Sequence, residues 1–179
     1  MGDALRRLFV SLGVALGLSV GQPDPALSAR IFQEEGIVQV NARIDDAFAP
    51  GTRELVDSGS SVALRFAAEL EAPGRPGRRA EETRYVFYDL RERRYMVSWG
   101  GGARTAALAD SATARSLASM VSDMRLCPVD ELASGGRITV SASIGILDGR
   151  GDWHEAPVLW NYARPSRSFA FGSPTEVPR

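Results

Sequence analysis

The sequence predicts a mainly β domain with some helix (α+β). We expect five to seven antiparallel strands in a sandwich-like or strongly twisted sheet, with one main helix at about 110–125. Three observations favour this fold class. Several segments alternate strictly between apolar and polar residues, which is typical of strands with one buried face. Two aromatic segments flank a short turn, and one later segment has apolar residues at helical spacing.

The first 29 residues predict a secretory signal peptide. Arg6 and Arg7 precede the apolar run Leu8–Val20, and small residues such as Ser28 and Ala29 follow it. The run is shorter than the roughly 20 apolar residues that a membrane span requires, although an uncleaved anchor is the alternative. We therefore divide the chain into a signal peptide (1–29), a single β-rich domain (30–172) and a loose C-terminal tail (173–179).

The sequence is compatible with more than one cleavage point. Cleavage after Ser28 or after Ala29 fits the small-residue pattern of signal peptides, and cleavage after Gly21 fits it less well. Either of the first two sites starts the mature domain near Arg30.

Alternation predicts the first strand of the domain over 38–45 and a longer one over 62–70. Between them, Pro50–Ser58 predicts a short helix that stops at Gly59. The polar side of each strand predicts that one face of the sheet is exposed to solvent or thinly covered.

The next two strands are predicted as a hairpin, Arg84–Leu90 and Tyr95–Trp99, because aromatic residues dominate both arms. A Pro- and Gly-rich turn precedes the hairpin. Together with strand 62–70, the hairpin forms a predicted up-down-up meander.

The main helix is predicted to begin with Asp110 or Ser111 as its cap and to end at about Arg125, before Pro128. Four apolar residues at helical spacing form its predicted buried stripe: Leu117, Met120, Val121 and Met124.

Three segments follow this helix. Alternation predicts a long strand over 138–146, and the segments 158–162 and 167–171 are candidates for one or two short strands.

Composition limits the classes of function. The net charge is −1, which excludes bulk electrostatic binding of nucleic acid. All 21 basic residues are arginine, as expected of a GC-rich bacterial genome. The single cysteine, Cys127, cannot form an internal disulfide, and we interpret it as a buried structural thiol.

Three stretches resemble an exported bacterial family known as domain of unknown function 4390. They are the strand, helix and strand of Ile37–Leu70, the hairpin Tyr85–Val97, and the capped helix, Gly-Gly turn and long strand of Thr105–Ile146. The chain departs from the family pattern after Leu147. The resemblance implies export and a β-rich domain; it implies no activity, no cofactor and no site residues.

One cluster has the residue types of a metal or acid–base site. The loop 148–155 holds the sole histidine among three carboxylates, and divalent metals need three or four such ligands together. The spacing fits neither an EF-hand nor a zinc motif, so a solvated hairpin loop is the simpler interpretation. The candidate ligands are Asp148, Asp152, His154 and Glu155.

Two further features of the sequence have a possible binding role. Gly100–Gly102 has backbone N–H groups that can bind an anion, but a flexible strand exit explains it as well. Arginines gather at two opposite ends of the hairpin, 75–79 and 91–94, where docking on lipid phosphates is a minor hypothesis.

The predicted function is a non-catalytic binding or interaction module in the bacterial periplasm, whose partner is an envelope protein or a small ligand. A metal-dependent or hydrolytic enzyme centred on the loop 148–155 is the first alternative. A carrier of small apolar ligands, with a cavity lined by Leu64, Phe66 or Met120, is the second. No cofactor is implied, and the sequence leaves the oligomeric state open.

Overall fold

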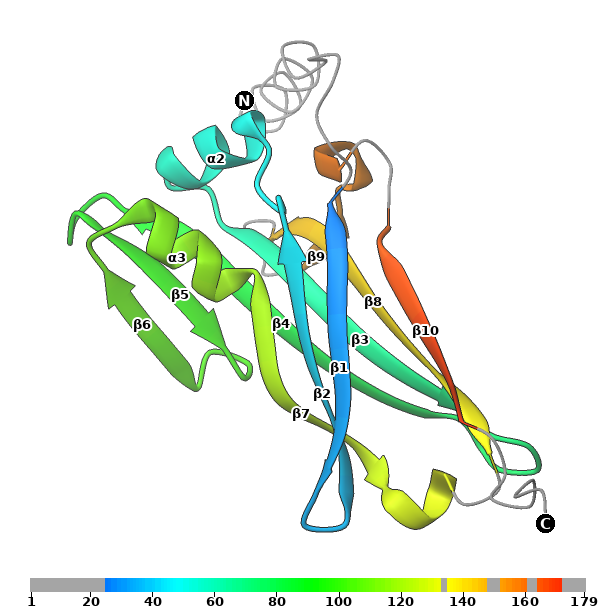
Figure 1. The fold of residues 1–179 in the computed structure, drawn as a ribbon. Coiled ribbons are helices and arrows are strands. Elements are labelled where there is room, and N and C mark those ends of the chain that lie inside the picture. Colours follow the sequence, from blue (N-terminus) through cyan, green and yellow to red (C-terminus); the bar gives the residue numbers. More distant parts are fainter. Residues whose placement is uncertain (1–24, 133–134, 148–151, 161–163, 172–179) are drawn as a thin grey trace.

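The computed structural model describes residues 25–132, 135–147, 152–160 and 164–171. Most of the predicted signal peptide, the C-terminal tail and Asp148 lie outside these residues. The described chain is mainly β, with antiparallel sheets and two short α-helices (Figure 1). The strands are β1 (Ala26–Glu34), β2 (Ile37–Asp45), β3 (Val62–Glu71), β4 (Arg78–Asp89), β5 (Arg94–Trp99), β6 (Arg104–Leu108), β7 (Met120–Pro128), β8 (Gly136–Leu147), β9 (Trp153–Glu155) and β10 (Ser166–Phe171).

The helices are short. α2 (Pro50–Asp57) and α3 (Ser111–Ala118) are α-helical, and η1 (Val129–Leu132) and η2 (Pro157–Trp160) are single 3₁₀ turns. Proline begins α2, and the carboxylate of Asp110 caps α3 by accepting from the N–H of Thr113 at 2.7 Å.

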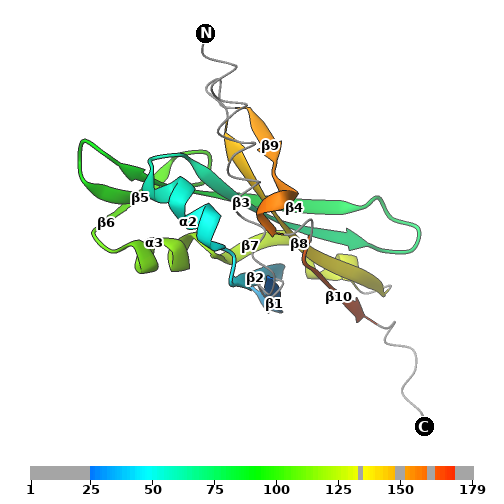
Figure 2. The same cartoon turned by 90° about the horizontal axis from the view of Figure 1, so that it is seen from above.

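The strands form two antiparallel sheets. The smaller sheet has the order β1-β2-β7, and the larger one has the order β10-β8-β3-β4-β5-β6 with β9 added to β8. In Figure 2, both α-helices and the smaller sheet lie on one side of the larger sheet, and β9 rises on the other. We call the covered side of the larger sheet its inner face and the opposite side its outer face.

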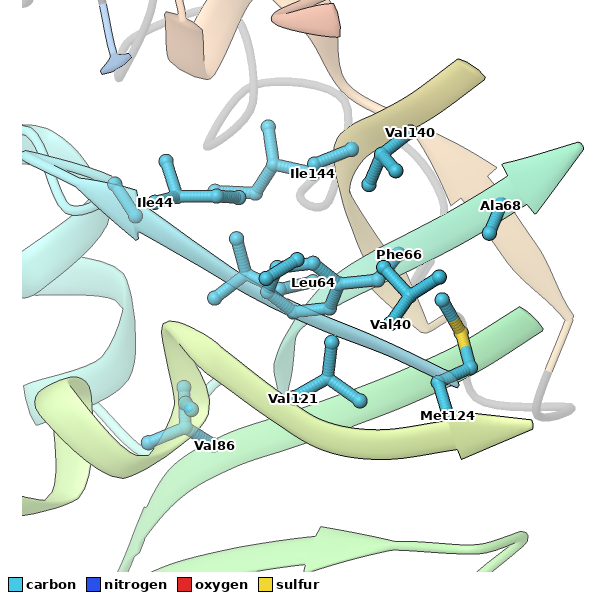
Figure 3. Packing of buried hydrophobic residues seen from close by; sticks show 14 of the residues in the cluster. Val40, Ile44, Leu64, Phe66, Ala68, Val86, Val121, Met124, Val140 and Ile144 are labelled. Atoms are coloured by element: carbon cyan, nitrogen blue, oxygen red, sulfur yellow. The ribbon is translucent and has the colours of Figure 1, made fainter. Parts of the chain in front are cut away.

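The core fills the space between the two sheets (Figure 3). It includes alternate residues of β3, such as Leu64 and Phe66, which are fully buried. Val40 and Ile44 of β2 meet them from the smaller sheet. Burial of this apolar area is the main force that holds the sheets together.

The segments with strict alternation are strands, as predicted. β2, β3 and β8 match the predicted ranges closely, β3, β4 and β5 form the predicted meander, and β10 matches the segment 167–171. The short helix also matches: α2 is followed by Gly59, which has a φ of 86°.

The predicted helix over 110–125 is wrong in its second half. α3 ends at Ala118, and β7 begins at Met120. β7 is bulged: Val40 and Ala42 of β2 face Met124 and Val121, so three steps on β7 match two on β2. The bulge spaces the buried Val121 and Met124 three residues apart, which imitates one turn of a helix.

A side-chain contact fixes this bulge. Asp123 has a φ of 60°, and its backbone N–H donates to Asn41 Oδ1 at 2.7 Å. Asn41 lies 82 residues away in the sequence, so no local pattern indicates this contact. The helical spacing of the apolar residues alone therefore gave the wrong prediction.

Other differences concern short elements. The structure has a 3₁₀ turn, Pro157–Trp160, where a strand over 158–162 was predicted; residues 161 and 162 lie outside the described part. β1, β6 and β9 were not predicted. β1 pairs with β2 in unbroken register from Ala26, so the predicted domain boundary at residues 29 and 30 falls inside a strand.

Candidate functional site

The outer face of the larger sheet brings together polar residues from four separate segments. Arg65 of β3 and Ser143 of β8 are cross-strand partners. Their neighbours Leu64, Phe66, Ala142 and Ile144 are buried on the inner face. Because successive side chains of a strand point to opposite faces, Arg65 and Ser143 both lie on the outer face.

Trp153 of β9 lies across this face. A Cβ atom added to Gly145 would meet the indole ring at 2.7 Å and the carbonyl oxygen of His154 at 2.5 Å. Only glycine therefore allows β9 to fold this closely onto β8. The guanidinium carbon of Arg65 lies 4.3 Å from the centre of the Trp153 ring, which holds the charge beside Ser143.

Two buried polar atoms at this place have no hydrogen-bond partner: Ser143 Oγ and Trp153 Nε1. Ser143 is only 5% exposed. A buried hydroxyl or indole N–H without a partner is costly, and the large majority of such groups in proteins are satisfied. Both atoms can donate a hydrogen bond.

The segments that carry Arg164 and Glu155 are both hydrogen-bonded to β8 next to Ser143. Ala142 N–H donates to the carbonyl of Pro165, and Ala156 N–H donates to the carbonyl of Ile144. The segment before β10 thus binds β8 one residue before Ser143, and the segment after β9 binds it one residue after Ser143.

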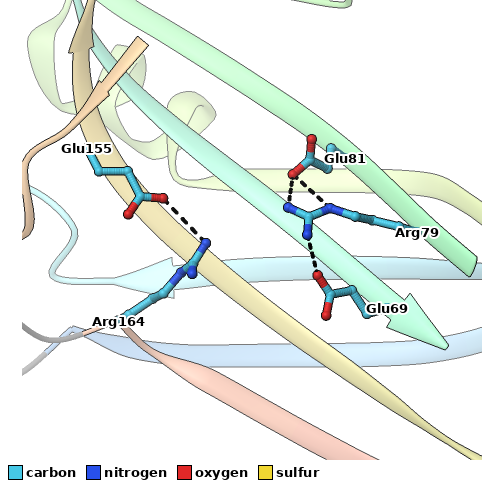
Figure 4. A network of polar contacts seen from close by, with 5 residues as sticks. All are labelled: Glu69, Arg79, Glu81, Glu155 and Arg164. Carbon is cyan, nitrogen blue, oxygen red and sulfur yellow. Dashed lines mark hydrogen bonds and ion pairs between the residues drawn. The ribbon is translucent and has the colours of Figure 1, made fainter. Parts of the chain in front are cut away.

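A single ion pair joins these two chains. Arg164 Nη2 lies 3.4 Å from Glu155 Oε1 (Figure 4). Both are about half exposed, so the pair is weak.

We call Arg65, Ser143, Trp153, Glu155 and Arg164 the outer-face cluster. It combines two guanidinium groups with a hydroxyl and an indole N–H, all of which are hydrogen-bond donors. Glu155 is the one carboxylate of the cluster, and its 3.4 Å contact with Arg164 is the type of weak pair that an incoming anion can replace. This donor set fits an oxyanion such as a carboxylate or a phosphate.

Other arginines of the sheet are already neutralised. On the same face, Arg79 donates to Glu69 at 2.5 Å and also to Glu81 (Figure 4). The Glu81 bond raises the pKa of Arg79 further above its ordinary value. Among the described residues, Arg65 has no carboxylate at ion-pair distance.

A buried guanidinium lies on the inner face. Arg84 is 7% exposed, forms an ion pair with Glu82 at 2.7 Å and stacks on Trp99 at 4.7 Å. Burial lowers the pKa of Arg84, and Glu82 opposes this effect. Arg84 Nε and Glu82 Oε1 are also buried without a hydrogen-bond partner, but the ion pair neutralises this guanidinium. We therefore place the candidate site on the outer face.

The structure separates the predicted loop residues. Asp148 lies outside the described part, Asp152 precedes β9, and His154 and Glu155 belong to β9. His154 pairs with Ile146, so its side chain lies on the face opposite to that of Trp153 and Glu155. Among the described residues, no group of three or more His, Cys, Asp or Glu is placed to hold a metal.

The same face assignment bears on hydrolysis. Ser143 lies on the outer face and His154 points to the other side, so these two residues do not form a nucleophile–base pair.

Two of the remaining sequence candidates have structural explanations. Gly100–Gly102 forms the turn between β5 and β6, and all three glycines have positive φ. In the first group of arginines, Arg78 pairs with Glu131 at 2.8 Å and Arg79 pairs as described above, so this end of the sheet is not a basic tip.

The three residues proposed to line an apolar cavity do not share one. Leu64 and Phe66 lie inside the packed core, and Met120 lines a shallow surface hollow beside α3.

Comparison of the chain with protein-family models, curated proteins and solved structures gives no match. The resemblance to domain of unknown function 4390 therefore stays a prediction.

Sequence reasoning missed Arg65, Ser143, Trp153 and Arg164. Arg65 and Ser143 were visible only as members of the polar sides of their strands. Which polar residues become neighbours depends on the pairing of β3 with β8. Arg65 and Ser143 are paired although they are 78 positions apart, so no local pattern indicates that they meet. Trp153 was the one usable signal, since a tryptophan in a Gly-rich loop is rarely solvated.

Proposed function

We propose that this protein is an exported, non-catalytic binding module that holds an oxyanion group of its ligand at the outer-face cluster. One observation carries the proposal: Ser143 Oγ is buried, lacks a hydrogen-bond partner and lies on the outer face of the sheet, opposite Arg65 on the neighbouring strand. The core thus lies on one side of the larger sheet and the donor set on the other.

The donors are held in place before any ligand arrives. Arg65 and Ser143 lie on two adjacent interior strands of the larger sheet, and stacking on Trp153 restricts the Arg65 side chain. A preorganised donor set loses little conformational entropy on binding. Such rigidity supports binding of a defined chemical group in preference to general surface charge.

Export remains part of the proposal. No helix in the described part of the chain is long and apolar enough to cross a membrane. Because β1 is paired from Ala26, cleavage after Ser28 or Ala29 would remove residues that pair with β2. We therefore propose cleavage after Gly21, which leaves β1 whole, and the N-terminal sequence of the mature protein tests it: a start at Gln22 supports the proposal, and a start at Ala29 or Arg30 contradicts it.

Isothermal titration calorimetry with inorganic phosphate and with acetate tests the binding proposal. We expect saturable binding of at least one anion at constant ionic strength, which separates the site from general screening. Removing one hydrogen bond to a charged group costs about 1.5–3 kcal/mol, so Ser143→Ala should weaken binding about tenfold or more.

Two matched variants serve as controls. Ser141→Ala is the control for Ser143→Ala, because it removes a hydroxyl two residues away on the same face of β8. Arg137→Gln is the control for Arg65→Gln, because it removes an exposed arginine of β8 that lies outside the cluster. Binding should survive in both controls and fall in Arg65→Gln. Equal losses in Ser141→Ala and Ser143→Ala, or no saturable binding by the parent protein, would overturn the proposal.

A further inference from the structure

The exposed edges of the two sheets differ in how well they are protected against pairing with another chain. β6 has only five residues, and β7 is bulged and ends in Pro128. β10 has six residues and follows Pro165. Short length, bulges and proline are the usual devices that keep an edge strand from pairing.

β1 has none of these devices. It is nine residues long, contains no proline, and pairs with β2 in one unbroken register. Its other edge is the free edge of the smaller sheet. In Figure 1, β1 and β10 lie close at their first residues and diverge towards the turn that joins β1 to β2. The half of β1 from Arg30 to Glu34 is therefore the accessible half.

The side chains of this half are complementary to themselves in one antiparallel register. Arg30, Phe32 and Glu34 share one face of β1, and they lie on the side opposite to the core-packed Leu27, Ala29 and Ile31. When Phe32 faces Phe32 of a second copy, each Arg30 faces Glu34 of the other copy. That register gives one aromatic pair and two pairs of opposite charge across a two-fold axis.

The neighbouring registers are worse. Pairing Ile31 with Ile31 puts Arg30 opposite Phe32, and pairing Arg30 with Arg30 puts like charges face to face. In the structure, Glu34 accepts a hydrogen bond from Gln39 at 3.2 Å, which keeps its carboxylate on the same face as Arg30.

We propose that two copies of this chain associate through β1 in the register that pairs Phe32 with Phe32, which joins the two smaller sheets into one. The paired segment is short, so the dimer is weak and depends on concentration. The inference does not rest on the oxyanion site, which lies on the other sheet.

Sedimentation equilibrium of the mature protein tests the association, and charge exchange tests the register. We expect Arg30→Glu to weaken the dimer about tenfold, because Glu then faces Glu34. The double variant Arg30→Glu with Glu34→Arg should restore it. Arg43→Glu, an exposed change on β2, is the matched control and should leave it unchanged.

Cysteine crosslinking gives a second measurement that does not depend on affinity. Phe32→Cys should form a disulfide between copies under mild oxidation, whereas Ser28→Cys should not, since the two Ser28 residues lie far apart in this register. The native Cys127 is buried and should not interfere. A monomer at all concentrations, a dimer insensitive to Arg30→Glu, or equal crosslinking of the two cysteine variants would overturn the proposal. Phosphate binding should be the same in monomer and dimer. Failure of the dimer proposal would therefore leave the proposal of the oxyanion site standing, and the reverse also holds.

Discussion

The two faces of the larger sheet are made by alternate residues of the same strands, yet they differ completely in what they bury. On the inner face, Leu64 and Phe66 are fully enclosed by apolar neighbours. On the outer face, Arg65 and Ser143 lie one residue away in each strand, and Ser143 Oγ has no hydrogen-bond partner. The inner face is dominated by apolar packing, with a buried ion pair between Arg84 and Glu82, and the outer face has a buried hydroxyl and a buried indole N–H without partners. We infer that the first face carries stability and the second carries binding.

The largest expected effect is a change of stability on the inner face. Phe66→Ala removes a fully buried aromatic ring and should lower the free energy of unfolding by about 3–5 kcal/mol. Arg65→Ala, one residue away, removes a stacked cation and should cost about 1 kcal/mol or less. Denaturant unfolding of the two variants measures the difference. Similar losses in both would contradict the division between the faces.

A smaller effect is expected where the outer face is closely packed. Gly145→Ala pushes a methyl group into the Trp153 ring and the His154 carbonyl, and it should destabilise the protein by about 1–3 kcal/mol. It should also displace β9 and weaken anion binding. Gly51→Ala is the control, since a Cβ there meets no atom within 4 Å. Its stability should change by no more than about 1 kcal/mol.

The cap of α3, which lies on the inner side of the larger sheet, should make the stability of the protein depend on pH. Hydrogen bonds from Thr113 hold the pKa of Asp110 below its ordinary value of 3.8. This carboxylate therefore contributes stability above that ordinary pKa, and the contribution is lost as the pH falls through the lowered pKa. Asp110→Ala should lower the thermal midpoint at pH 7 and have less effect at strongly acidic pH. Calorimetry at the two pH values checks this; an equal drop at both would show that the cap does not act through its charge.

The smallest effect concerns the single thiol on the core side of β7. Burial raises the pKa of Cys127, and its side chain is enclosed, so a thiol reagent at neutral pH should modify it only slowly. Ser141→Cys places a second thiol on the outer face, which should react much faster. The modification rates of Cys127 and of the cysteine at position 141 measure how accessible the core side and the outer face are to the reagent. Fast modification of Cys127 in the native protein would show that the inner face is not sealed.

The fold was largely predictable because burial of one face leaves a period of two in the sequence. β2, β3 and β8 carry that period without interruption, so their ranges and their buried residues follow from the sequence. β7 was misassigned because its bulge at Asp123 breaks the period, and the cause is a contact with Asn41 on another strand.

The candidate site was not predictable in the same way. The sequence drew attention to His154, since it is the sole histidine, and to the carboxylates around it. The structure draws attention to Ser143, which has no distinguishing local context among the serines of its strand. Its environment depends on Arg65, Trp153 and Arg164, which are brought together by strand pairing and by the close approach at Gly145.

The indole N–H groups of the three tryptophans offer the most direct test of the central claim, that the outer face binds an oxyanion through donors left without partners. In ¹H–¹⁵N spectra of the mature protein, titration with inorganic phosphate or acetate should shift the Trp153 signal. The signals of Trp99, on the inner face, and of Trp160, which already donates to the carbonyl of Ala47 at 2.9 Å, should stay in place. Ser143→Ala should reduce the Trp153 response at a given anion concentration. A Trp153 signal that does not move at any concentration of either anion, or one that moves no more than the other two, would contradict the account.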